Sequence, residues 1–334
     1  MSPRRLPSCC VLLVLALSAP AWADEGSDAG KTDAGPTTAP APALPFRVDH
    51  DAPLDVAEDL VTEAKDHTQY RVEFNGINRD RVPAFVYVPK DGRAKHPAVL
   101  LQYGSGGNKT TNYIVALAHQ FVARGFTVLT IDVPNRGERK AKGPRNFWQG
   151  LARGGTFLQT LGDYSRAVDY LVSRDDVDRD RIGYAGISLG AITGLTFVAH
   201  EPRVAAMVSI VGGANLLGGL KVALDPDVKK AAERIDPFYY AARIAPRPLM
   251  LMNATRDQLV PRFFGEQLHK AAGEHGTKVW VETDHFFTGV DRYAVLETVI
   301  DFMQESLTSP QRPTGGESVP LAEQVAPGRR DRSK

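Results

Sequence analysis

A serine flanked by glycines is the clearest candidate for chemistry in this chain. The pentapeptide Gly186-Ile187-Ser188-Leu189-Gly190 follows an apolar stretch at 181–185 and precedes a helix-compatible run at 191–200. Glycine two positions on either side of Ser188 leaves room for a tight turn that holds the serine in a strained conformation. A strand, turn and helix of this kind would expose the hydroxyl beside helix amides that stabilise negative charge. The pattern predicts a nucleophile; the simpler alternative is a turn that only closes a strand.

A serine hydroxyl needs a base within hydrogen-bond reach before it can attack. The chain has eight histidines, and most of them fall in polar loops or near helix ends. His285 instead stands directly after an expected strand at 278–281 and before an expected helix at 292–307. This position would put it at the carboxyl edge of the sheet, the same edge as Ser188. The alternative is a loop histidine that only packs against its aromatic neighbour.

The base in turn needs an acid that orients its ring. Asp257 follows an expected strand at 247–252, again at the carboxyl edge, although an aspartate there could also serve only as a turn residue. Asp284 is the main rival, but it adjoins His285, and neighbouring side chains in extended structure diverge. Asp132, at the end of another strand, is a weaker rival. We therefore assign the acid to Asp257.

Attack by a serine on an acyl carbon also requires donors for the resulting oxyanion. The amide of Leu189, directly after the nucleophile, is one expected donor. The second is expected from the glycine-rich loop 104–108 that follows the strand 98–103. Ser105 is our first choice in that loop and Gly106 the second. The residues expected to contact the substrate are Tyr103, Gly104, Gly106 and Trp148.

The periodicity of the chain predicts alternating strands and helices. Expected strands are 70–74, 84–88, 98–103, 127–131, 181–185, 203–211, 247–252 and 278–281; expected helices are 113–124, 161–173, 191–200, 262–272 and 292–307. The first two strands resemble a hairpin. The later alternation predicts an α/β fold with a mostly parallel sheet covered by helices on both faces. In such sheets ligands bind at the carboxyl ends of the strands.

Both ends of the chain differ in composition from its centre. Residues 1–23 resemble a signal peptide, with a basic start, a short apolar core and an Ala-x-Ala cleavage pattern. Residues 24–45 form an Ala/Pro/Thr-rich spacer and 309–334 a polar tail, which leaves 46–308 as the folded domain. We therefore expect export to the periplasm or medium, with no membrane span after cleavage; an uncleaved anchor is the alternative.

Composition narrows the function further. Both cysteines lie in the leader, so the mature chain would have neither a disulfide nor a thiol nucleophile. A net charge of +1 gives no electrostatic argument for nucleic acid. The loop before Lys109 resembles a phosphate-binding loop only superficially, because its glycines are wrongly spaced. The basic segment 135–145 would favour an anionic substrate or be a solvated loop, and 216–240 would line an acyl pocket or pack in the core.

Taken together, residues 69–306 resemble the α/β-hydrolase superfamily, and most closely its dienelactone hydrolase-like and acetyl xylan esterase-like branch, which borders the prolyl oligopeptidases. The resemblance rests on 103–107, 176–183, the elbow 186–190, 244–248, the loop around Asp257, and His285. The order serine, aspartate, histidine is also that of this superfamily. Two positions depart from the family pattern: Tyr103 stands where histidine is frequent, and Asp284 where glycine is frequent.

The resemblance implies an α/β-hydrolase that cleaves an ester through a Ser188, Asp257 and His285 triad and an acyl-enzyme intermediate. It implies neither a metal nor an organic cofactor. The expected substrate is a small ester or an acylated saccharide. Two alternatives remain: a peptidase of the prolyl oligopeptidase kind, although no large N-terminal propeller is present in the sequence, and a non-catalytic binding protein on a hydrolase scaffold. The sequence makes no prediction of the oligomeric state.

Overall fold

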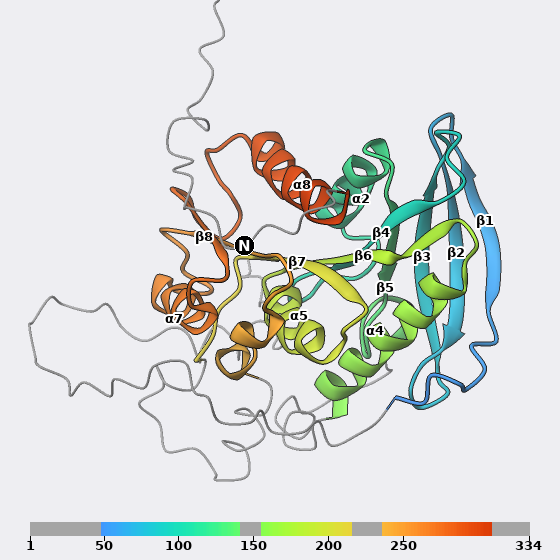
Figure 1. Cartoon of the computed structure of the whole chain (residues 1–334), viewed down its shortest axis with the longest axis horizontal. Coiled ribbons are helices and arrows are strands. Elements are labelled where there is room, and N and C mark those ends of the chain that lie inside the picture. The colour runs from blue at the N-terminus through green and yellow to red at the C-terminus, as the bar shows by residue number, and fades with distance from the viewer. Residues whose placement is uncertain (1–47, 141–154, 216–235, 309–334) are drawn as a thin grey trace, which may run out of the picture.

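A computed structural model describes residues 48–140, 155–215 and 236–308 (Figure 1). In this part of the chain, nine strands form one sheet in the order β1-β2-β3-β5-β4-β6-β7-β8-β9. The strands are β1 (Ala57–Glu63), β2 (His67–Asn75), β3 (Arg81–Pro89), β4 (His96–Gln102), β5 (Thr127–Ile131), β6 (Val177–Ile187), β7 (Val204–Ile210), β8 (Leu249–Ala254) and β9 (Thr277–Val281). The first pairings, from β1 through β3 to β5, are antiparallel, and all pairings from β5 to β9 are parallel.

Helices cover both faces of this sheet. The helices are α2 (Asn112–Ala123), α4 (Gly155–Ser173), α5 (Leu189–His200), α7 (Arg262–Ala272) and α8 (Arg292–Thr308), with short 3-10 turns η1 (Gly137–Arg139), η2 (Pro237–Tyr239) and η3 (Ala241–Ile244). Helices α2 and α8 pack on one face, and α4, α5 and α7 on the other (Figure 1). The predicted fold, a mostly parallel sheet between two helical layers, is therefore confirmed.

The central strand β4 shows why this sheet needs both layers. All seven of its residues are buried. Ala98 and Leu100 face the core beneath α4, α5 and α7, whereas Val99 and Leu101 face the core beneath α2 and α8. Because side chains alternate between the faces of a strand, a continuous apolar run requires a hydrophobic cover on each side.

The predicted elements agree with the structure except at the N-terminal edge of the sheet and at the start of α4. Strand β1 was not predicted, because all seven of its residues are exposed and no buried face imposes alternation. Helix α4 begins earlier than expected, at Gly155. The predicted leader 1–23, the spacer 24–45 and the tail 309–334 lie outside the described residues, and so does Trp148.

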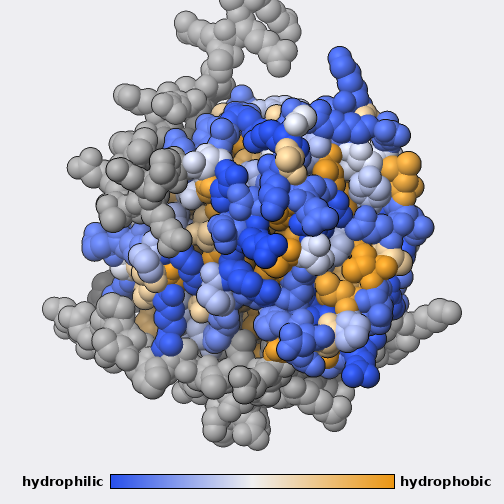
Figure 2. All heavy atoms as spheres, turned by 45° about the vertical axis from the view of Figure 1, so that its right-hand side comes forward, coloured by the Kyte–Doolittle hydropathy of each residue, from blue (hydrophilic) through white to orange (hydrophobic). Residues whose placement is uncertain are grey.

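The surface on the β1 side is mostly hydrophilic, with separate apolar patches (Figure 2). Among the described residues, the exposed large aliphatic side chains are Val56, Leu60 and Val61, which lie on β1 or just before it. Among the described residues, none of the helices is long and apolar enough to cross a bilayer.

Candidate active site

Ser188 stands at a sharp turn between β6 and α5. Its backbone has φ 55° and ψ −116°, and its amide donates to the Ile210 carbonyl at 2.8 Å. A Cβ added at Gly186 would lie 2.4 Å from the Gly190 carbonyl oxygen, and one added at Gly190 would lie 2.5 Å from the Gln102 carbonyl oxygen. Both contacts are with backbone that cannot give way. The prediction that glycines make this turn possible is confirmed.

His285 and Asp257 come together beside this serine. His285 Nε2 lies 3.1 Å from Ser188 Oγ, and His285 Nδ1 lies 2.7 Å from Asp257 Oδ2. The Asp257 carboxylate is an acceptor only, so Nδ1 carries the ring proton and donates it. Nε2 therefore presents its lone pair to the serine hydroxyl. This arrangement can remove a proton from Ser188.

Asp257 is held in place by its own loop. Its Oδ1 accepts hydrogen bonds from the amides of Leu259 at 2.9 Å and Val260 at 2.8 Å. The residue is only 6% exposed, so the carboxylate is shielded from water and committed to the loop and to His285. A carboxylate fixed in this way can orient the imidazole without itself moving.

The two rival acids have other partners. Asp284 accepts from the amides of Phe286 at 2.9 Å and Thr288 at 3.0 Å, and hydrogen bonds from Thr288 keep the pKa of Asp284 below its ordinary value. Asp284 therefore closes the turn after His285. Asp132 is fully buried and binds Lys109, as described below.

The glycine-rich loop lies against the nucleophile. A Cβ added at Gly104 would lie 3.1 Å from Ser188 Cβ, and the Gly104 amide donates to the Tyr113 hydroxyl at 2.9 Å. Ser105 and Gly106 are exposed, and Gly106 has φ +86°. Leu189 is the first residue of α5, where an amide has no acceptor within its helix. The two expected oxyanion donors thus belong to segments that meet at Ser188.

Tyr103 lies beneath this loop. It is only 3% exposed, and its hydroxyl accepts a hydrogen bond from the Val133 amide at 2.9 Å; burial raises the pKa of this hydroxyl. A Cβ added at Gly107 would lie 3.0 Å from Tyr103 Cβ. Tyr103 was predicted to contact the substrate, but the structure buries its ring beneath the loop, so its side chain supports the loop instead.

A buried lysine ties the loop to the end of β5, and sequence reasoning missed it. Lys109 is 2% exposed, its amide donates to Asp132 Oδ1 at 3.0 Å, and its Nζ donates to Asp132 Oδ2 at 2.6 Å. Nζ also contacts Glu138 and lies over the Phe85 ring, 5.1 Å from its centroid. The only available signal was a lysine and an aspartate at two neighbouring strand ends.

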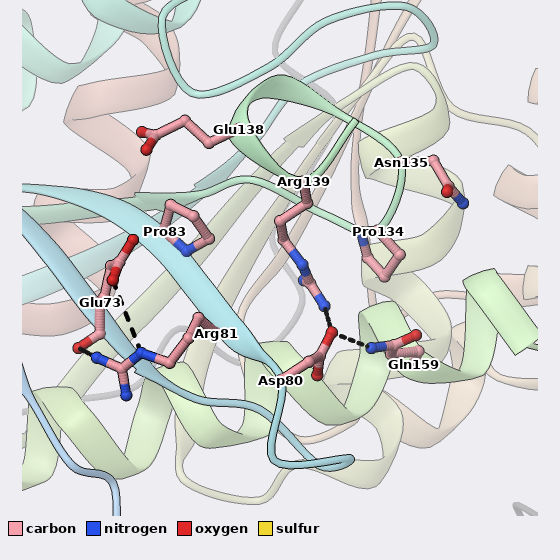
Figure 3. Close-up of a pocket in the computed structure, with 9 residues that line it drawn as sticks. All are labelled: Glu73, Asp80, Arg81, Pro83, Pro134, Asn135, Glu138, Arg139 and Gln159. Atoms are coloured by element: carbon pink, nitrogen blue, oxygen red, sulfur yellow. Dashed lines mark hydrogen bonds and ion pairs between the residues drawn. The ribbon is translucent and has the colours of Figure 1, made fainter. Parts of the chain in front are cut away.

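The described part of the basic segment borders a polar pocket of about 460 Å³ (Figure 3). Arg139 pairs with Asp163 at 2.7 Å and with Asp80, and Arg81 pairs with Glu73. The lining contains the carboxylates of Glu73, Asp80 and Glu138 but only two arginines, Arg81 and Arg139. Both arginines of the lining are already paired with carboxylates, so neither offers an uncompensated positive charge to an anion. The rest of the segment, from residue 141 onwards, lies outside the described residues.

The other predicted pocket segment is only partly described. Tyr240 is fully buried, and Phe238 packs against the core, so core packing accounts for these two aromatic residues. Residues 216–235 lie outside the described part of the chain. Within the described ranges, no group of three His, Cys, Asp or Glu side chains is arranged to hold a metal ion.

The comparisons with known proteins agree with this fold. A family model described as X-Pro dipeptidyl-peptidase (S15 family) matches residues 76–221. Esterase YjfP of Escherichia coli (strain K12) is 24% identical over 199 residues, which cover 54% of this chain and 76% of that protein. Acetyl xylan esterase 1 from Thermoanaerobacterium sp. JW/SL YS485 matches with a TM-score of 0.62 at 23% identity, over 77% of this chain and 89% of its own. Acetyl xylan esterase from Paenibacillus sp. R4 matches with a TM-score of 0.62 at 20% identity, over 80% of this chain and 97% of its own.

These likenesses bear out the superfamily that the sequence motifs suggested. The protein has the α/β-hydrolase fold. The family match and the esterase relative support hydrolase activity for this chain.

Proposed function

We propose that the protein is a serine esterase that cleaves carboxylic esters through Ser188, His285 and Asp257. The observation that carries this proposal is the hydrogen-bonded chain from Asp257 through His285 to Ser188, with contacts of 2.7 Å and 3.1 Å. The three side chains follow three different strands, β6, β8 and β9, and meet at one edge of the sheet. No packing requirement explains a charged, a titratable and a hydroxyl group converging there.

The proposed reaction has two halves. His285 Nε2 takes the hydroxyl proton of Ser188 as Oγ bonds to the acyl carbon, and the carbonyl electron pair moves to oxygen. The amides of Leu189 and Ser105 bind that oxyanion, and each such donor typically contributes about 3 kcal/mol. The imidazolium then protonates the alcohol oxygen, whose bond to the acyl carbon breaks. Water repeats the sequence on the acyl-enzyme and restores Ser188.

The names of the relatives support an ester as the bond that is cleaved. One sequence relative is called an esterase, and two structural relatives are called acetyl xylan esterases. We extend this to a small ester or an acylated saccharide as the substrate of this chain. We further propose that residues 1–23 direct export, so that the enzyme acts in the periplasm or outside the cell.

A peptidase is the second candidate, and one observation favours it. The family model that matches residues 76–221 describes X-Pro dipeptidyl-peptidases. The same triad serves both reactions, because an amide and an ester pass through similar tetrahedral intermediates. The bond that is cleaved therefore depends on substrate contacts and not on the triad.

The first experiment is labelling with a fluorophosphonate probe, comparing wild type with Ser188→Ala. Labelling that vanishes in the variant would establish an activated serine. Hydrolysis of p-nitrophenyl esters of increasing acyl length, set beside a Xaa-Pro p-nitroanilide, separates the two candidates. Removing Ser188 should lower turnover by about a million-fold. Well-folded wild-type protein that is neither labelled nor active would exclude both candidates and favour the binding-protein alternative.

A further inference from the structure

Two adjacent phenylalanines follow His285 and point in different directions. Phe287 packs against the core between the sheet, α2 and α8. Phe286 is 65% exposed, and its ring meets the His285 ring edge-to-face, with centroids 5.5 Å apart and planes at 84°. A single exposed apolar side chain needs no explanation by itself. Phe286, however, contacts the imidazole of His285, which we propose transfers the proton, and this contact places Phe286 at the site.

The backbone around Phe286 is braced. Asp284 Oδ1 accepts the Phe286 amide at 2.9 Å and the Thr288 amide at 3.0 Å. Thr283 Oγ1 donates to the Thr288 carbonyl at 2.9 Å, and the Phe287 amide donates to the Asp284 carbonyl at 3.1 Å. These bonds close both sides of the turn. The exposed ring is thus presented by a fixed backbone, so only its side-chain torsions have to be ordered when a ligand packs on it.

The proposed reaction indicates which part of a substrate lies near the Phe286 ring. The imidazolium formed at His285 gives its Nε2 proton to the leaving alcohol oxygen, so that oxygen has to lie within hydrogen-bond distance of Nε2. The expected oxyanion site is bordered instead by Gly104, which contacts Ser188 from a different loop than His285 does. The alcohol portion of the ester therefore leaves past His285, and Phe286 is the exposed aromatic side chain in ring contact with it.

We infer that Phe286 forms the apolar wall on which the leaving alcohol packs, so that the enzyme prefers esters of alcohols carrying a flat apolar ring close to the ester oxygen. This inference rests on the proposed esterase function. Edge-to-face and offset contacts between rings contribute about 0.5–1.5 kcal/mol beyond the area they bury, which corresponds to a preference of up to about tenfold.

The test compares esters that share one acyl group and differ only in the alcohol. The acyl group is the one hydrolysed fastest in the p-nitrophenyl series, and the alcohols are benzyl, 2-phenylethyl and n-butyl alcohol. All three esters form the same acyl-enzyme, so differences in kcat/KM report only the acylation step, where the alcohol is still bound. Phe286→Ala should lower kcat/KM about five- to tenfold for the two aromatic esters and less than about twofold for the butyl ester.

Two further variants keep the result interpretable. Phe286→Leu keeps apolar volume but removes the aromatic face, so it should lose part of the preference while folding like wild type. Tyr293→Ala removes another exposed aromatic ring, 71% exposed and near the start of α8, and should change all three esters equally. The fluorophosphonate labelling rate of each variant checks that Ser188 remains activated.

The outcomes separate this inference from the proposed function. If Phe286→Ala lowers kcat/KM equally for all three esters, or for none, the inference is wrong while the esterase assignment stands. If wild type hydrolyses no ester in a Ser188-dependent manner, the proposed function is wrong and the inference falls with it. A loss confined to the aromatic esters supports both.

Discussion

Replacing Asp257 with asparagine tests the direction in which the proposed triad passes its proton. Asp257 uses Oδ1 for the amides of Leu259 and Val260, and Oδ2 for His285 Nδ1. Asparagine has one side-chain carbonyl oxygen and one NH₂ group. The oxygen has to stay with the two loop amides, because an NH₂ group placed there would face two donors. The NH₂ group therefore turns toward His285 and donates to Nδ1.

This contact moves the ring proton to Nε2, which lies 3.1 Å from Ser188 Oγ. The serine hydroxyl then faces a donor instead of an acceptor and has lost its base. We expect kcat to fall about 10⁴-fold, which corresponds to about 5 kcal/mol of transition-state stabilisation. KM should change much less, because Asp257 is buried and does not touch the substrate. Initial rates with the best p-nitrophenyl ester measure both constants.

Asp284→Asn is the matched control for this experiment. Asp284 uses one oxygen, Oδ1, for the amides of Phe286 and Thr288, and asparagine keeps a carbonyl oxygen for that place. We expect kcat within about threefold of wild type, as for a surface substitution that preserves its hydrogen bonds. A fall in Asp284→Asn as large as that in Asp257→Asn would refute the assignment of the acid. So would an Asp257→Asn variant that stays within about tenfold of wild type.

Three further predictions concern stability and the elbow. Lys109→Met should lower the free energy of unfolding by about 3 kcal/mol in urea titrations, because it removes the cation paired with the buried Asp132 carboxylate and leaves that charge to the amides of residue 109 and Glu138; a loss below about 1 kcal/mol would contradict the buried pair. Gly190→Ala should abolish fluorophosphonate labelling and destabilise the fold by about 1–3 kcal/mol, because its Cβ would meet the Gln102 carbonyl; undiminished labelling would refute the steric argument. Burial lowers the pKa of His269 to about 4, so the unfolded chain binds this proton more tightly, and stability should fall by about 2–3 kcal/mol as pH drops from about 6.5 to 4. His269→Gln should reduce that slope in urea titrations, and an unchanged slope would assign it to other groups.

Most of the fold could be predicted from local sequence patterns. Alternating apolar strands and amphipathic helices report the faces that must be buried, and each of these patterns lies within a single element. The edge strand β1 was not predicted, because its seven residues are all exposed and leave no pattern of a buried face in the sequence. The start of α4 was also placed too late, at residue 161 instead of Gly155.

The sequence by itself determined the elbow. The steric conflict at Gly186 is with the Gly190 carbonyl in the same turn, so the pentapeptide carries its own signature, whereas the conflict at Gly190 is with the Gln102 carbonyl and belongs to the tertiary structure. It also indicated a histidine and an aspartate at the carboxyl edge, because parallel strands all end there. Sequence reasoning favoured Asp257 over Asp284 and Asp132 but could not show what each carboxylate binds.

Only the tertiary structure decided those partners. His285 and Asp257 are 28 residues apart, and their contact depends on the register of β8 against β9 and on the path of two loops. The same holds for the burial of Tyr103, the pairing of Lys109 with Asp132, and the closure of the turn by Asp284. A hydrogen bond is decided over about 3 Å, whereas sequence patterns fix only which edge or face a side chain occupies. Distances of that size are settled by how the whole core packs.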